Sequence, residues 1–356
     1  MNVNHILSVR DGDTLKTLQS FLAEWWRRVG LDAMLGPVET GQDGVASPKV
    51  ITQPADLARL NPFTPVMLSN TAAMVQDFVK DHPHSHLAVI GRPCELRAMV
   101  ELQKRRRVSY QPLSTARGRE RLVVIGVDCP GTYSPPEHHP RHGEMIHVAV
   151  MYGRQESYIP YDVRPTCQMC DSPAPLSADM IIGTIGVEPE GELLIIAHNE
   201  ELDASLKLHE LTDRTATERE VVHREMMVGK LVDKRVEKRA ALIKSQQSQT
   251  EELGTVLAMF ARCTLCADCL DACPLYDGEL AGMLGVDKNR RSSHSLLAEM
   301  VRVSRWLASC SGCGMCRESC PQGVPLAQVV TVLSHRIQSE LRYRPGDPAQ
   351  PLPWTV

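Results

Sequence analysis

Eight of the twelve cysteines in this 356-residue chain stand in two copies of one spacing near the C-terminus. Both copies read C-x2-C-x2-C-x3-C-P; we call them the first run (Cys263, Cys266, Cys269 and Cys273) and the second run (Cys310, Cys313, Cys316 and Cys320). This spacing is typical of chains that bind two cubane 4Fe–4S clusters, where the fourth cysteine of each run ligates the other cluster. We therefore predict one cluster on Cys263, Cys266, Cys269 and Cys320, and another on Cys310, Cys313, Cys316 and Cys273.

A structural zinc protein without redox activity is the alternative, because cysteine-rich sets also bind zinc. Zinc sites rarely use three cysteines in succession at this spacing, so the motif favours iron–sulfur clusters. Two clusters in tandem predict that single electrons pass through the chain.

Composition narrows the class of protein further. The net charge of −4 gives no indication of a nucleic-acid partner. The N-terminus lacks the basic start and apolar core of a secretory signal, and no apolar run approaches the length of a membrane span. The cysteine usage points to a reducing compartment rather than to a disulfide framework. We expect a cytoplasmic protein without a membrane span, either free or docked on a partner.

The pattern of apolar residues divides the chain into four parts. Short apolar runs alternate with helical patterns over residues 1–205, which predicts an α/β domain with strands at 87–90, 121–129 and 193–197 and a helix at 94–106. A long helix and hinge are expected over 206–250, and an all-α dicluster ferredoxin domain over 251–336. The proline-rich tail, 337–356, is expected to be extended or disordered.

Two helical segments support this division. Thr217 followed by Glu220 is a capping-box pattern, which predicts a charged helix running to about Ile243, before a Gln- and Ser-rich hinge at 245–250. A helix at 295–308 separates the two runs, and this gap is too long and too helical for a short βαβ ferredoxin. Residues 251–336 instead resemble the α-helical ferredoxin found in the iron–sulfur subunits of succinate dehydrogenase and of heterodisulfide reductase.

Four cysteines remain outside the runs: Cys94, Cys129, Cys167 and Cys170. A lone cysteine at a strand end is usually a small core residue. The C-x2-C of Cys167 and Cys170 is compatible with zinc or with a redox dithiol. Together, however, they number four, which is what one more cubane needs.

Three segments around these cysteines resemble the beta-subunit family of coenzyme F-420-reducing hydrogenase and F-420-dependent formate dehydrogenase. Residues 89–98, VIGRPCELRA, resemble its VGxPCQxxAL segment, and residues 124–132, VIGVDCPGT, resemble IGLFCxGT. Residues 164–186 are similar to RPxCxxCxDxxxxxADIxxGDxG. The resemblance covers residues 15–245, with the motifs in the family's order.

The resemblance implies a third 4Fe–4S cluster on Cys94, Cys129, Cys167 and Cys170, beside a bound FAD. The flavin contacts that it implies are Gly91, Arg92, Pro93, Gly183, Thr184 and Gly186, with Ser69 and Asn70 in place of the family's SKY segment. Thr184 replaces the family's Asp, and the ferredoxin follows the domain here instead of preceding it. No GxGxxG fingerprint occurs in the chain, so FAD and the hydride donor coenzyme F-420 rest on the resemblance alone.

The resulting hypothesis is an iron–sulfur flavoprotein subunit of a larger oxidoreductase. The partners implied are the catalytic subunit of a formate dehydrogenase or hydrogenase, or a heterodisulfide-reductase-like complex. A flavin-free electron relay is the alternative. The histidines His138, His139 and His142 have no metal-site spacing and are expected on a solvated loop.

Overall fold

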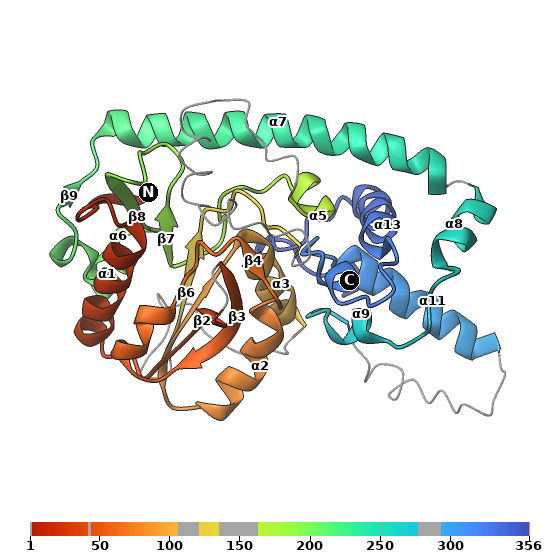
Figure 1. Cartoon of the computed structure of the whole chain (residues 1–356), viewed down its shortest axis with the longest axis horizontal. Helices are drawn as coiled ribbons and strands as arrows, with labels where there is room; N and C mark the ends of the chain where they lie inside the picture. The colour runs from red at the N-terminus through yellow and green to blue at the C-terminus, as the bar shows by residue number, and fades with distance from the viewer. Residues whose placement is uncertain are drawn as a thin grey trace.

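The computed structural model describes residues 2–41, 44–105, 121–134, 163–250, 252–276 and 293–355 (Figure 1). In the described residues of the N-terminal part, nine strands form one sheet in the order β4-β3-β2-β5-β6-β7-β8-β1-β9. The strands are β1 (Val3–Ser8), β2 (Ala33–Glu39), β3 (Val45–Ile51), β4 (Val66–Met67), β5 (His86–Gly91), β6 (Arg121–Val127), β7 (Met180–Gly183), β8 (Glu192–Ala197) and β9 (Arg214–Thr215). The predicted strands at 87–90, 121–129 and 193–197 are therefore confirmed.

The centre of the sheet is parallel and its margins are mixed. Strands β2, β5, β6 and β7 run parallel to their neighbours, whereas β3 pairs antiparallel with β2, and β8 with β7. The chain leaves β5 just before Cys94 and leaves β6 just before Cys129. Both cysteines thus stand at the carboxyl edge of the parallel strands, which is where open α/β sheets bind ligands.

Helices cover both faces of the sheet because the buried strands alternate their side chains. Ala88 and Ile90 pack with α1 (Thr14–Val29) and α6 (Glu200–Leu206), while Leu87 and Val89 pack with α2 (Ala72–Asp81) and α3 (Pro93–Lys104). Two short elements, η1 (Pro54–Arg59) and α5 (Pro165–Gln168), lie in the connections. The α/β prediction for this part is confirmed.

The long helix α7 spans Glu218–Thr250 and runs over both parts of the molecule (Figure 1). Its predicted start is confirmed, since the Glu220 carboxylate accepts hydrogen bonds from the Thr217 backbone N–H (2.7 Å) and hydroxyl (2.8 Å). Its predicted end near Ile243 is wrong. The Gln- and Ser-rich stretch continues the helix, because glutamine and serine cost little helical propensity where no proline or glycine intervenes.

The elements described from residue 252 onward are all helices. They are α8 (Leu253–Phe260), α9 (Asp268–Asp271), α11 (Ser293–Ala308), α12 (Met315–Glu318) and α13 (Leu326–Glu340). The helix predicted between the two runs is α11. The C-terminal part is therefore helical in the residues described, as predicted.

The proline-rich tail is not disordered, which corrects the prediction from its composition. It is irregular, but it packs on α3: the Tyr343 hydroxyl donates to the Glu101 carboxylate at 2.6 Å, and the Gly346 N–H donates to the same oxygen at 3.0 Å. Glu101 is fully buried. A buried carboxylate needs donors, and the tail supplies two of them.

Candidate metal centres

The structure brings the four isolated cysteines to one cavity. Cys94 lies in the first turn of α3, Cys129 follows β6, Cys167 lies in α5, and Cys170 follows it. All four line the same cavity at the carboxyl edge of the sheet. Segments separated by more than seventy residues of sequence thus converge on the arrangement that a third cluster needs.

Buried ionic groups hold the loops of this cavity in place. The Glu95 carboxylate accepts from the Arg92 backbone N–H and from the Thr71 N–H and hydroxyl, each at 2.8 Å, which fixes the start of α3. The Arg164 side chain donates to the carbonyls of Tyr133 (3.0 Å) and Met67. These charge-assisted bonds join β4, the loop after β6 and α5.

Burial keeps these thiols protonated in the absence of metal. It raises the pKa of Cys94 well above the usual value, with further contributions from Glu95 and Cys129. Burial also raises the pKa of Cys129 to about 11, although Arg92 acts in the opposite direction. A buried thiolate requires a compensating positive charge, which iron provides on binding.

The thiols of the two runs fall into two electrostatic groups. Burial raises the pKa of Cys269, and the charges of Cys320, Cys266 and Cys263 raise it further. For Cys273, the indole N–H of Trp306 donates to its sulfur at 3.3 Å, and the thiol whose charge raises its pKa is Cys310. These groups agree with the exchange of the fourth cysteine that the spacing predicts.

The donor arrangement suits clusters better than single metal ions. Within the described residues, no three His, Cys, Asp or Glu side chains are gathered closely enough to hold one metal ion. Structural zinc needs four ligands within about 2.3 Å of one point, whereas each thiolate of a cubane binds a different iron. Four cysteines around a cavity fit the second case.

The second run lies against the cavity of the isolated cysteines. Cys313 and Met315 line that cavity. Arg97 joins the two sites: its Nη2 donates to the Ser311 carbonyl at 2.8 Å and lies 4.0 Å from the Cys170 sulfur. Gly314 has a φ of 78° and packs so closely on Thr166 that a Cβ would collide with it. The first run lies at the surface, with Cys263 and Cys266 exposed.

Half of the predicted flavin contacts line the cysteine cavity. Ser69, Asn70, Arg92 and Pro93 do so, and a hydrogen bond from Asn70 acts against the burial that raises the pKa of Cys313. This half of the predicted contact set fits a planar ligand beside the cysteines.

The other half is packed elsewhere in the described residues. Gly91 faces Glu95 and Leu96 of α3, while Gly183 and Gly186 pack directly on Arg224 of α7. The Thr184 N–H donates to the Asp128 carboxylate at 2.8 Å, and this carboxylate forms a buried ion pair with Arg224. The small size of both glycines is thus explained by contact with an arginine side chain, and these residues do not line the cysteine cavity.

Sequence reasoning missed the charged residues that organise the site. Asp128 and Arg97 stand inside the motifs that were singled out, so their place beside a cysteine was a usable signal. Arg224 and Arg239 lie on a helix whose charges look solvent-exposed in sequence, and nothing there distinguishes them. The predicted loop histidines, His138, His139 and His142, lie outside the described residues.

An α/β domain with four cysteines at its sheet edge, joined to a helical domain with two cysteine runs, defines a modular iron–sulfur protein. Residues 84–221 belong to the family described as the C terminus of the coenzyme F420 hydrogenase/dehydrogenase beta subunit. Residues 259–324 are a 4Fe–4S dicluster domain. Both resemblances drawn from the motifs are therefore confirmed.

Curated relatives extend the match over most of the chain. The F420-dependent formate dehydrogenase subunit beta of Methanocaldococcus jannaschii is 24% identical over 342 residues, covering 85% of this chain and 84% of its own. The F420-dependent formate dehydrogenase 1 subunit beta of Methanococcus maripaludis is 24% identical over 305 residues, covering 77% and 75%.

A search of solved structures finds a chain of the F420-reducing NiFe hydrogenase complex from Methanosarcina barkeri. It has a TM-score of 0.49 and 13% identity, covering 71% of this chain and 94% of that one. Within the described residues, no helix is both long and apolar enough to cross a membrane.

Proposed function

We propose that this chain is the electron-transfer subunit of a larger oxidoreductase and passes single electrons along three 4Fe–4S clusters. The observation that carries the proposal is the shared cavity of Cys94, Cys129, Cys167 and Cys170, because Cys313 of the second run also lines it. The order of sites would be the isolated cysteines, the second run and the exposed first run. Such an order leads from the sheet edge to the surface.

The chain's own groups would set the potentials of these clusters. Arg97 places a guanidinium beside Cys170 and beside the second-run loop. A nearby positive charge favours the more negative, reduced state of a cluster, and hydrogen bonds to the sulfurs act in the same direction. The Trp306 N–H that donates to Cys273 is such a bond. Burial of Cys310 and Cys316 would keep water from the middle cluster.

The finer part of the proposal is a flavin beside the isolated cysteines. When bound, FAD supplies the exchange of a two-electron donor for single electrons. Ser69, Asn70, Arg92 and Pro93 are the described residues placed to contact it. The relatives' names support a formate dehydrogenase or hydrogenase partner and coenzyme F420 as the two-electron carrier. A heterodisulfide-reductase-like partner is proposed from the helical ferredoxin.

A flavin-free relay is the second candidate function. The observation that favours it is the packing of Gly183 and Gly186 on Arg224, away from the cysteine cavity. In that case the α/β domain would hold one cluster and dock on a partner that carries the two-electron centre.

Anaerobic purification from the native cell tests both candidates. Three clusters require about twelve irons per chain at four per cluster. About eight irons would remove the third cluster, and zinc without iron would remove the whole proposal. A flavin extracted from the pure protein distinguishes the main candidate from the relay.

Titration with electron donors completes the test. NADH and NADPH are expected to reduce the flavin slowly, because the chain carries no dinucleotide fingerprint. Reduced F420 is expected to bleach it. Rapid reduction by NADH would contradict the donor assignment.

A further inference from the structure

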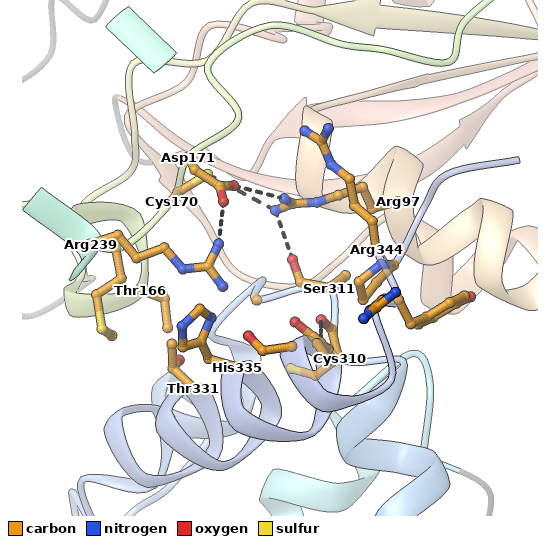
Figure 2. Close-up of a pocket in the computed structure, with 17 residues that line it drawn as sticks. Arg97, Thr166, Cys170, Asp171, Arg239, Cys310, Ser311, Thr331, His335 and Arg344 are labelled. Atoms are coloured by element: carbon orange, nitrogen blue, oxygen red, sulfur yellow. Dashed lines mark hydrogen bonds and ion pairs between the residues drawn. The ribbon is translucent and has the colours of Figure 1, made fainter. Parts of the chain in front are cut away.

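A second pocket opens on the far side of Cys170, between α5, α7, α13 and the tail (Figure 2). It has a volume of about 360 Å³, within the range of small-molecule sites. Its described lining contains four arginines and one carboxylate: Arg97, Arg239, Arg342, Arg344 and Asp171. The residues come from four separate segments, so their convergence is a product of the fold.

The single carboxylate does not balance these charges. Asp171 forms ion pairs with Arg239 and, at 3.6 Å, with Arg97 (Figure 2). Although burial acts to raise the pKa of Asp171, Arg239 and Arg97 lower it, so this carboxyl stays ionised. Arg342 and Arg344 have no carboxylate partner in the part of the chain that the structure describes. Two guanidinium charges in the pocket are therefore left uncompensated.

The uncharged lining also favours an anion. Hydroxyl groups of Thr166, Thr331 and Ser339 face the pocket as further donors. Guanidinium groups present paired N–H donors whose geometry matches phosphate oxygens. A ligand with several anionic oxygens would satisfy this lining, whereas an apolar or cationic ligand would not.

The position of the pocket links it to the redox sites. The cysteines in its lining are Cys170 of the isolated set and Cys310 of the second run. Cys263 and Cys266 of the first run are not in its described lining. A charge bound here would thus act on two of the three candidate clusters.

We propose that this pocket binds a phosphate-class polyanion, either inorganic diphosphate or the diphosphate of a nucleotide, and that binding lowers the reduction potentials of the two adjoining clusters. The second half rests on the proposed function. A reduced cluster carries one more negative charge, so the anion binds the oxidised protein more tightly. By linkage, tenfold tighter binding to the oxidised state lowers a one-electron potential by about 59 mV.

Calorimetry on the anaerobically purified full-length protein tests the site. The probes are sodium diphosphate, ADP and FAD, at constant ionic strength set with NaCl. The test variant is Arg342→Gln/Arg344→Gln, and the control is Arg336→Gln, an exposed arginine on α13 outside the pocket. We expect the double substitution to weaken diphosphate binding at least tenfold and the control to leave it unchanged.

The competition pattern identifies the source of the phosphate. Nucleotides that compete with diphosphate assign the pocket to a nucleotide diphosphate, and diphosphate binding without nucleotide binding assigns it to the inorganic ion. No diphosphate binding, or equal binding by the test and control variants, overturns the proposal.

Redox titration followed by electron paramagnetic resonance tests the linkage. Saturating diphosphate should lower the potentials of the isolated-cysteine and second-run clusters and leave the first-run cluster unchanged. Equal shifts of all three clusters, or none, would refute the linkage. Absence of iron would instead remove the proposed function, and the calorimetric result would still stand.

Discussion

The two cysteine runs have identical spacing and opposite surroundings. In the first run Cys263 and Cys266 are exposed, and the neighbouring Leu265 is 88% exposed. In the second run Cys316 is buried, and the loop packs on Thr166 and Arg97 of the α/β domain. Spacing fixes the local ligand loop, whereas position in the relay depends on what packs against it.

This difference assigns different tasks to equivalent clusters. A buried cluster between two others can exchange electrons only within the chain, because a protein shell separates it from any external partner. An exposed cluster can meet such a partner. We therefore expect the second run to act as the internal step and the first run as the terminal one.

Removing a second-run ligand should produce the largest effect. Cys313→Ala is expected to lose up to about four irons and to cut the isolated-cysteine cluster off from the first run. The matched variant Cys266→Ala should lose a similar amount of iron but leave the other two clusters connected. The check is stopped-flow oxidation of the reduced protein by a protein oxidant too large to enter the cavity.

In the Cys313→Ala variant the isolated-cysteine cluster should become the slow phase. If both variants slow that cluster equally, the two runs do not differ in the way proposed.

The exchange of fourth ligands gives the next largest effect. Cys273→Ser should disturb the spectrum of the second-run cluster, although Cys273 belongs to the first run in sequence. Cys320→Ser is the reciprocal control and should disturb the first-run cluster. Resonance spectra of both variants decide the matter, and damage that stays within the run carrying the substitution would contradict the assignment.

Chelation of iron should separate the runs by rate. The exposure of Cys263 and Cys266 predicts that a chelator under mild oxidation removes about four irons per chain first, from the first-run cluster. The remaining irons should be released later, because their ligands are buried. Loss of all clusters in a single phase would show that burial of the second run offers no protection.

The sequence predicted local features well and tertiary ones poorly. The capping box at Thr217 and the buried strand of β5 depend on near neighbours, so both could be recognised directly. The end of α7 could not, because a Gln- and Ser-rich stretch is compatible with helix or hinge until its packing is known. The cysteines were found because their chemistry is rare, yet Arg224, which occupies the space beside Gly183, resembles any helical arginine.

The tail shows the same limit. Proline content predicted disorder, but a buried carboxylate on α3, Glu101, creates a demand for donors that composition does not reveal. Tyr343 meets that demand from more than two hundred residues away in sequence.

The smallest expected effect comes from this tail, which shields the second-run side alone. Gly346 packs on Arg97, and Tyr343 donates to Glu101, so the tail holds the α/β domain against the second-run loop. Burial and the Glu101 carboxylate raise the pKa of Tyr343, so its hydroxyl stays protonated and continues to donate at any ordinary pH. Tyr343→Phe removes one hydrogen bond to a buried charge, which costs about 1.5–3 kcal/mol.

The consequence should be local to the second run. Tyr343→Phe is expected to lower the midpoint of urea unfolding and to speed chelation of the second-run iron, leaving the first-run rate unchanged. Tyr276→Phe is the control, since the Tyr276 hydroxyl has no hydrogen-bond partner among the described residues. If both substitutions change second-run chelation equally, the Tyr343–Glu101 contact does not protect that cluster. If Tyr343→Phe speeds both runs, the tail stabilises the whole helical domain, and the contrast between the runs must then come from the α/β contact alone.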